Sequence, residues 1–190
     1  MHSPRNGGPG KDHGFSMVEL LVTLAVAGVL LASAAPKFID LVHDHRLSTQ
    51  INLLLTDVHL ARIEAIKRNH EVVICRSIDG RHCDIGGGSQ SDWSAGRIIY
   101  VNLDGDKTRD PGEPLLQARA VLPSRLNLRF NQWWRVTFHP DGSASNGSFA
   151  LCDFRGSEHA RALILYYTGR PRVADRRADG DPIDCGETAG

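Results

Sequence analysis

The chain has 190 residues, with 22 basic and 22 acidic side chains and a formal net charge of zero at pH 7. This balance excludes neither nucleic acids nor membranes as partners, so any electrostatic argument has to be local. The sequence contains no glycine-rich phosphate loop, no G-x-S-x-G and no H-E-x-x-H. These absences favour a structural or binding protein without a cofactor over an enzyme.

The first predicted element is an apolar helix, expected to span the membrane over residues 15–36. Residues Phe15–Ala35 contain a single charged side chain, that of Glu19. They form a rod about 31 Å long, enough to cross the hydrocarbon core of a bilayer. The short stretch before them carries Arg5 and Lys11 and has no apolar core of its own. That composition excludes an ordinary secretory signal peptide.

The start of this helix carries a recognisable motif. Gly14, Phe15 and Glu19 form the pattern G-F-x-x-x-E, and Pro36 follows at the far end of the apolar segment. The motif resembles the class III leader of type IV pilins and pseudopilins. The resemblance implies that a prepilin peptidase removes residues 1–14 and that Phe15 becomes N-methylated. A plain single-pass anchor with an incidental glutamate is the alternative.

The resemblance also implies a role for Glu19 in filament assembly. Its carboxylate can pair with the new amine of Phe15 in its own chain, because the first and fifth residues of a helix share a face. It can equally pair with the amine of a neighbouring subunit, which would favour one register between subunits. The sequence leaves both pairings open.

The basic residues before the apolar segment predict its orientation. By the positive-inside rule, Arg5 and Lys11 place the N-terminal end in the cytoplasm. The protein is then a single-pass protein of the bacterial inner membrane, with everything after the apolar segment in the periplasm. Disulfide bonds are expected to form in such an oxidising compartment.

Beyond Pro36 the helix is predicted to continue as an amphipathic segment over residues 37–70, ending near Asn69. Its apolar residues recur mostly at three- and four-residue steps, at Ile39, Val42, Leu47, Ile51, Leu54, Leu55, Val58, Ala61, Ala65 and Ile66. The opposite face is expected to carry the polar residues Asp44, Arg46, Gln50, Asp57, Arg62 and Lys67. Such an apolar stripe packs on a globular core. Two helices separated at Pro36 are the alternative.

From Glu71 onward, short β-type runs alternate with clusters of Gly, Pro, Asn and Asp. The predicted strands are Val72–Arg76, Gly96–Asn102, Glu113–Gln117, Leu126–Phe130, Arg135–His139, Ser148–Cys152, Ala162–Tyr167 and Arg170–Val173. The segment 71–190, about 120 residues, is large enough for one domain with its own core. The aromatic residues are interpreted as core or strand residues rather than a stacking platform: Trp93, Phe130, Trp133, Trp134, Phe138 and Tyr166.

The predicted fold class is therefore α+β and resembles the pilin "lollipop". A long N-terminal helix has a transmembrane half and an amphipathic half, and the second half packs on an antiparallel β-sheet head. The head is expected in the periplasm, with its C-terminal tail tied down by a disulfide bond.

Four cysteines allow three disulfide connectivities. Cys75 and Cys83 bracket a short loop, and a bond between Cys152 and Cys185 would tie a tail rich in Gly, Pro and Asp to a central strand. Each bond stabilises a fold by roughly 2–4 kcal/mol. The alternative is a zinc site that combines cysteines with His70, His82 or His159. The lack of a C-x-x-C pair and the oxidising compartment favour disulfides.

One acidic loop has the spacing of a calcium ligand set. Positions 1, 3, 5, 7, 9 and 12 of an EF-hand-like loop fall on Asn102, Asp104, Asp106, Thr108, Asp110 and Glu113. Lys107 occupies the position that normally holds glycine, and no helical pattern flanks the loop. A long polar hairpin is therefore favoured over a calcium site.

The segment Leu163–Val173 predicts a basic surface. An apolar strand leads to a turn at Gly169, after which Arg170 and Arg172 point to one side of an extended chain. Both guanidinium groups can then reach one phosphate backbone, with Arg176 and Arg177 as further candidates. Residues 155–177 carry six arginines against two acidic residues, whereas the tail after Ala178 carries four acidic residues and no basic one. A solvated strand edge, with the arginines paired to Asp175 or Glu158, is the alternative.

The G-R-x-R string at Gly169, Arg170 and Arg172, the Cys75…Cys83 loop and the acidic hairpin together resemble the FimT/GspH family of minor pilins and pseudopilins. In FimT-like members the G-R-x-R segment is associated with DNA binding during natural transformation. The acidic tail departs from that pattern and is positioned to neutralise part of the arginine charge.

The resemblance implies one of two functions. The first is a minor pilin of a type IV pilus that binds DNA without regard to sequence. The second is a GspH-type minor pseudopilin of a type II secretion system that binds no DNA. The partners implied are a prepilin peptidase, other minor pilins or pseudopilins at a filament tip, the inner membrane and, in the first case, DNA.

Overall fold

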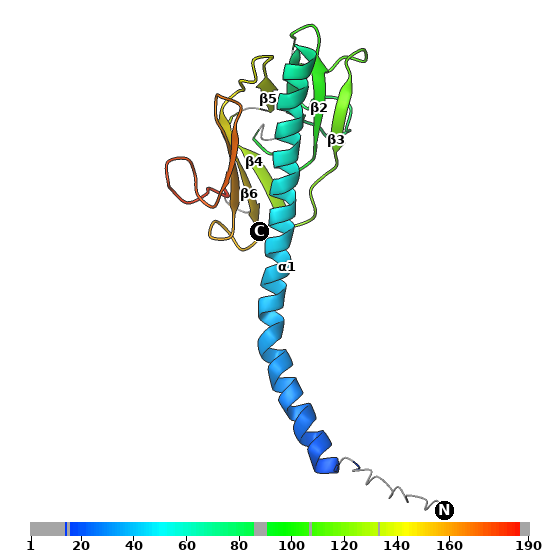
Figure 1. The fold of residues 1–190 in the computed structure, drawn as a ribbon, viewed down its shortest axis with the longest axis vertical. Helices are drawn as coiled ribbons and strands as arrows, with labels where there is room; N and C mark the ends of the chain where they lie inside the picture. The colour runs from blue at the N-terminus through cyan, green and yellow to red at the C-terminus, as the bar shows by residue number, and fades with distance from the viewer. Residues whose placement is uncertain (1–13, 15, 86–90, 107, 133, 187–190) are drawn as a thin grey trace, which may run out of the picture. The chain divides into compact units, whose positions relative to one another are not determined.

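The computed structural model describes residues 14, 16–85, 91–106, 108–132 and 134–186, with the side chains of 33–36 left aside. They form one helix and eight strands (Figure 1): α1 (Met17–Arg68), β1 (Glu71–Arg76), β2 (Arg97–Asn102), β3 (Leu115–Arg119), β4 (Leu126–Phe130), β5 (Arg135–Phe138), β6 (Gly147–Asp153), β7 (Arg161–Leu165) and β8 (Pro171–Ala174). The chain divides into two compact units, Met1–Val42 and His43–Gly190.

Helix α1 belongs to both units and runs without a break from Met17 to Arg68. It therefore passes Pro36, and the alternative of two separate helices is wrong. Within the first unit its large apolar side chains are exposed, from Met17 to Leu41. By length and composition this helix is able to cross a membrane.

In the second unit, the same helix runs alongside the strands (Figure 1) and buries one apolar stripe. The buried side chains recur at steps of three and four residues, as the amphipathic pattern predicts, and are at most 3% exposed: Leu47, Ile51, Leu54, Val58, Ala61 and Ala65. The helix ends at Arg68, and Asn69 follows in a left-handed conformation with φ of 55°. This conformation is typical of a residue that terminates a helix, so the predicted end near Asn69 is confirmed.

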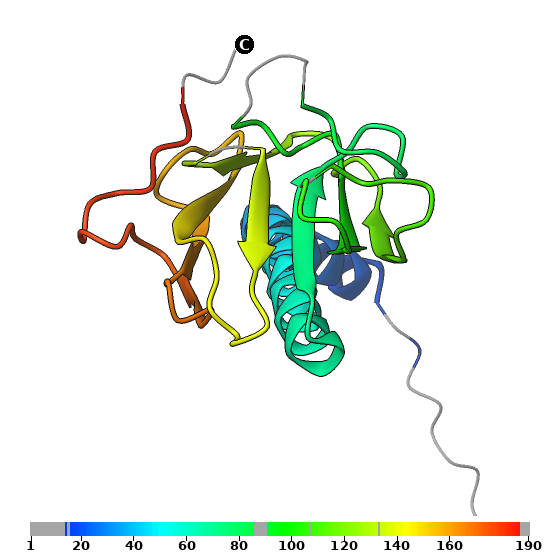
Figure 2. The same ribbon diagram turned by 90° about the horizontal axis from the view of Figure 1, so that it is seen from above.

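The strands form two antiparallel four-stranded sheets, ordered β3-β2-β1-β5 and β4-β6-β7-β8. Figure 2 shows them side by side, with α1 below both. All eight predicted strands are present with boundaries within two residues of those expected. The predicted fold class, a long N-terminal helix followed by antiparallel β structure, is confirmed. The division into two sheets was not predicted.

The main core lies between α1 and the two sheets. Trp93 packs edge-on against Phe130 and Phe149, with ring centroids 5.6 and 5.0 Å away, and the two phenyl rings stack at 4.2 Å. Phe138 is also fully buried. The interpretation of Trp93, Phe130 and Phe138 as core residues is confirmed. Trp134 packs against a smaller cluster around Tyr100, and Trp133 lies outside the described residues.

One residue of α1 contradicts the predicted polar face. Asp57 is completely buried, and its carboxylate accepts hydrogen bonds from Arg97 of β2 and Arg119 of β3. The Arg97 Nη2 atom lies 2.6 Å from Oδ2 and the Arg119 Nη2 atom 2.9 Å from Oδ1. A buried carboxylate is stable only when paired and hydrogen-bonded. Asp57 therefore connects the helix to two strands of one sheet.

Both favoured disulfide bonds are present, between Cys75 and Cys83 and between Cys152 and Cys185. The second bond joins cysteines that are 33 residues apart in the sequence. It brings the tail onto the face of the second sheet that points away from the main core. Ile183 of the tail is 1% exposed there. The tail is thus held both by a covalent bond and by apolar burial.

Candidate nucleic-acid interface

The turn between β7 and β8 requires glycine at position 169. Gly169 has a φ of +70°, and its N–H donates to the carbonyl of Tyr166 at 2.8 Å. A Cβ atom here would lie 2.1 Å from the carbonyl oxygen of Gly142. No side chain fits in that space, and L-residues also disfavour this backbone conformation. The glycine of the G-R-x-R string therefore serves to shape the turn.

The turn is fastened to the rest of the head. Arg62 of α1 donates from Nε to the Gly142 carbonyl at 3.1 Å, and the N–H of Ala144 donates to the carbonyl of Tyr167 at 3.0 Å. The β7–β8 turn is thus held against the loop after β5 and the last turns of the helix. This anchoring fixes the backbone from which Arg170 extends.

The two candidate arginines share one face of an edge strand. In the β7–β8 ladder Arg172 lies opposite Ile164, and the N–H of Tyr166 donates to the carbonyl of Arg170 at 3.3 Å. Ile164 belongs to the cluster on the outer face of the sheet. Since residues directly opposite, and residues two apart, point to the same face, Arg170 and Arg172 project from that outer face.

Both arginines are exposed. Within the described part of the chain, neither guanidinium group forms a hydrogen bond or an ion pair. The ion pairs with Asp175 or Glu158 that were weighed as the alternative are therefore not formed among these residues. The two charges are available to an external anion.

The other arginines of residues 155–177 are less available to bind an anion than their number indicates. The Arg155 Nη2 atom contacts Asp44 at 2.8 Å and Asp153 at 2.9 Å, and it is mostly buried. Its hydrogen bond holds the pKa of Asp44 below the ordinary value. The further candidates Arg176 and Arg177 lie at the start of the tail. Arg177 faces Asp179 at 3.6 Å, and Arg176 donates to the carbonyl of Gly180.

The acidic tail folds back, as the sequence predicted, but it does not cover the arginine pair. Its described acidic residues are Asp179, Asp181 and Asp184, all exposed. Among the described residues, the ion pairs of these carboxylates are limited to that between Asp179 and Arg177. The tail therefore lies on the same face of the sheet as Arg170 and Arg172 without pairing with either.

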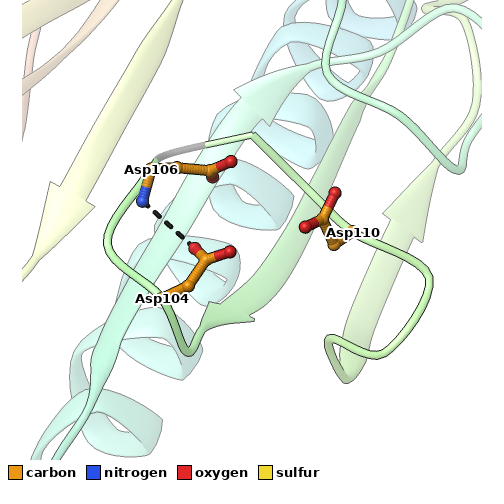
Figure 3. A group of neighbouring side chains, drawn as sticks. All are labelled: Asp104, Asp106 and Asp110. Atoms are coloured by element: carbon orange, nitrogen blue, oxygen red, sulfur yellow. Dashed lines mark hydrogen bonds between the residues drawn. The ribbon is translucent and has the colours of Figure 1, made fainter.

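The acidic loop between β2 and β3 has the features of the favoured hairpin. Carboxylate oxygens of Asp104, Asp106 and Asp110 lie within 4.8 Å of one another (Figure 3), and all three residues are exposed. Glu113 accepts the N–H of Leu103 at 2.6 Å and that of Asp110 at 3.0 Å. The expected twelfth calcium position thus closes the loop through the protein's own hydrogen bonds. Lys107 lies outside the described residues.

At the N-terminus, the structure describes only part of the predicted leader motif. Gly14 is exposed, and Glu19 lies exposed in the first turn of α1, where a carboxylate interacts favourably with the helix dipole. Phe15, the predicted first mature residue, lies outside the described residues. Cleavage, methylation and the assembly role of Glu19 therefore stay predictions.

Comparison with known families decides the class of protein. Residues 50–169 match the family model described as "Type II transport protein GspH", and residues 10–35 match the prokaryotic N-terminal methylation motif. The chain belongs to the GspH family. It is accordingly a minor pilin or pseudopilin of a type IV filament system, a class of structural subunits.

Individual relatives of this GspH-family chain agree with that assignment. It is 29% identical over 145 residues to the pilin-like protein PilA1 of Thermus thermophilus, covering 75% of this chain and 77% of the relative. The fold is similar to crystal structures of the type IV minor pilin FimU of Pseudomonas aeruginosa. The two crystal forms give TM-scores of 0.54 and 0.52 at 19% and 20% identity, covering 68% and 67% of this chain and 89% and 92% of FimU.

The GspH match ends at Gly169, so Arg170 and Arg172 follow the matched region directly. Family membership therefore supports the architecture that carries the arginine pair, and the match does not extend to the pair itself. Sequence reasoning missed two residues that support the site, Arg62 and Gly142. It also missed the buried Asp57, which pairs with the other sheet, although Asp57 lies within the apolar stripe of the helix, between Leu54 and Val58.

Proposed function

We propose that this GspH-family protein is a minor pilin of a type IV pilus and that it binds DNA, without regard to sequence, through Arg170 and Arg172. The observation that supports the proposal is the pair of exposed guanidinium groups on one face of an edge strand, without carboxylate partners among the described residues. Guanidinium groups bind phosphate oxygens through charge-assisted hydrogen bonds. Contacts of this kind read no base edges and carry no sequence information.

Binding at this site is expected to be weak and sensitive to salt. The arginine pair, together with Arg176 or Arg177, would neutralise about three phosphates. On duplex DNA the logarithm of the association constant then falls with the logarithm of salt concentration at a slope near −2.7. The acidic tail on the same face opposes binding further at low salt, where its charges are least screened.

The proposal is tested by the double variant Arg170→Ala/Arg172→Ala. We expect the full chain in detergent to bind a labelled DNA in fluorescence anisotropy at low salt, and the variant to bind it at least about tenfold more weakly because two phosphate contacts are lost. The matched control is Arg46→Ala/Arg81→Ala, which removes two exposed arginines elsewhere on the head. Equal losses in both variants, or no binding by the wild-type protein, would contradict the proposal.

The second candidate is a GspH-type minor pseudopilin of a type II secretion system that binds no DNA. The description of the matched family and the acidic tail beside the arginine pair favour it. In this case the outer face of the second sheet contacts other subunits or a secreted protein. A wild-type chain without DNA affinity at low salt is the result this candidate requires.

Maturation and location are proposed together for either candidate. We propose that a prepilin peptidase cleaves after Gly14, that Phe15 becomes N-methylated and that Glu19 pairs with an N-terminal amine during assembly with other minor subunits. The match to the methylation motif and the apolar first half of α1 support an inner-membrane anchor with the head in the periplasm. Mass spectrometry of protein purified from its membrane is expected to find an N-terminal peptide that starts at Phe15 and carries one added methyl group. A peptide that starts at Met1 would refute it.

A further inference from the structure

Two exposed tyrosines adjoin the arginine pair. Tyr167 is 70% exposed and Tyr166 is 44% exposed, whereas Trp93, Phe130, Phe138 and Phe149 of this head are packed in the core. Within the described chain, neither tyrosine ring contacts another ring, and neither hydroxyl forms a hydrogen bond. Nothing in the described structure of the head accounts for their position at the surface.

The strand register places Tyr166 beside both arginines. The β7–β8 ladder pairs Ile164 with Arg172, and the bond from the Tyr166 N–H to the Arg170 carbonyl continues it by one pair. Tyr166 is thus directly opposite Arg170 and diagonal to Arg172. Side chains of directly opposite residues have Cβ atoms about 5 Å apart, and a diagonal neighbour is within reach of an aromatic or long side chain. The outer face therefore presents the Tyr166 ring next to two guanidinium groups, and the exposed Tyr167 follows in the turn.

The backbone beneath these rings is fixed. The carbonyl of Tyr167 accepts the N–H of Ala144, the N–H of Gly169 closes the turn onto Tyr166, and the Gly142 carbonyl lies against Gly169. A ligand that stacks on the tyrosines consequently does not have to order a loop. Such pre-organisation reduces the entropic cost of binding.

From this arrangement we infer that Tyr166 and Tyr167 form a stacking platform for unpaired bases, so that the arginine site prefers single-stranded to duplex DNA. The inference rests on the proposed DNA binding and names its substrate class. Arginine contacts to phosphates are possible with either form of DNA, but the faces of the bases are accessible only when the strand is not paired. Stacking of one base on an aromatic side chain contributes about 1–3 kcal/mol. The tyrosines therefore add affinity for single strands that the arginines do not supply.

A neighbouring protein subunit is another ligand that exposed tyrosines can contact. The arginines favour DNA because they lie next to Tyr166 on the same face. In a DNA strand every base is followed by a phosphate, so a base stacked on the ring brings a phosphate close to a guanidinium group. A protein surface would have to supply two carboxylates around an apolar patch to match it. The test separates the two cases.

The test uses the full chain in detergent and two labelled probes, an oligothymidine strand and a duplex of the same length, compared by fluorescence anisotropy. The wild-type protein is expected to bind the single strand about tenfold or more tightly than the duplex, the ratio that 1.4 kcal/mol of stacking gives. Tyr166→Ala/Tyr167→Ala removes this preference and leaves duplex binding within about twofold. Tyr166→Phe/Tyr167→Phe keeps it, since stacking needs the ring and not the hydroxyl.

Two further variants make each outcome decisive. Arg170→Ala/Arg172→Ala is expected to weaken the binding of both probes. Phe154→Ala, which removes an exposed ring outside this site, is expected to leave the binding of both unchanged. Arginine-dependent binding without a single-strand preference overturns the platform and leaves the proposed function in place. Absence of binding to both probes overturns both. Alanine variants that bind DNA normally but fail to join a filament assign the tyrosines to a neighbouring subunit and also overturn the inference.

Discussion

Replacing Asp57 with alanine is expected to lower the free energy of unfolding of the head by about 3–5 kcal/mol, the cost of leaving a buried charge without its partner. Arg97 is 3% exposed at its side chain and donates to Asp57 from both Nε and Nη2. Without the carboxylate, its guanidinium charge stays buried, and the bond from Arg119 that joins β3 to the helix is lost as well. Both defects lie at the contact between α1 and one sheet.

Urea denaturation of the full chain in detergent, followed by tryptophan fluorescence, measures this loss, because Trp93 lies in the main core. The control is Glu64→Ala on the same helix, whose partners Lys67 and Arg68 are substantially exposed. Surface pairs of this kind contribute roughly 0–1 kcal/mol. If Asp57→Ala were no more destabilising than Glu64→Ala, the Asp57–Arg97 pair would have no structural role.

The second large effect is expected from Gly169→Ala, at about 2 kcal/mol or more of destabilisation. The alanine would combine an unfavourable left-handed backbone with a Cβ atom 2.1 Å from the Gly142 carbonyl oxygen. Relief requires the β7–β8 turn to move away from the loop that anchors it. We therefore expect weaker DNA binding as well, although both arginines remain in the chain.

Gly156→Ala is the matched control, because Gly156 has a φ of +86° and open space where a Cβ would stand. This variant measures only the cost of placing an L-residue in the left-handed conformation, roughly 1–2 kcal/mol. Thermal unfolding and DNA affinity are compared for both variants. Equal destabilisation by the two substitutions would show that the approach of Gly142 does not restrict the turn.

The elements of the fold were predictable because their signals are local. The stripe from Leu47 to Ala65 repeats within each helical turn, and each strand is bounded by its own turn residues. The partition into two sheets depends on which distant strands pair. Strand β1 pairs with β2 and also with β5, across some sixty residues of chain, and no local pattern encodes that choice.

The candidate site was also predictable in part from local signals. The spacing of Arg170 and Arg172 was enough to put them on one face, and the turn at Gly169 was also expected. The structure added what holds that turn, since Arg62 and Gly142 come from distant parts of the chain. It also added the exposure of Tyr166, whose place at the end of an apolar strand indicated only a core or strand position.

Asp57 shows where residue type misleads and periodicity does not. It lies three residues after Leu54 and four before Ala61, which puts it on the buried side of the helix. Residue type favoured the polar face instead. The two arginines that make its burial stable stand 40 and 62 residues further along the chain, a separation at which sequence pattern gives no information about contact.

The outer edge of β8 has a consequence for a protein whose family assembles into filaments. The carbonyl of Arg170 points toward β7. Because backbone groups alternate in an antiparallel ladder, the backbone groups of Pro171 and Val173 point to the open edge of the sheet. An exposed edge strand is normally a template for pairing with another copy. Pro171 has no N–H to offer, and two arginines on one copy repel those on the next. The strand that presents the arginine pair is thereby protected from aggregation by strand addition.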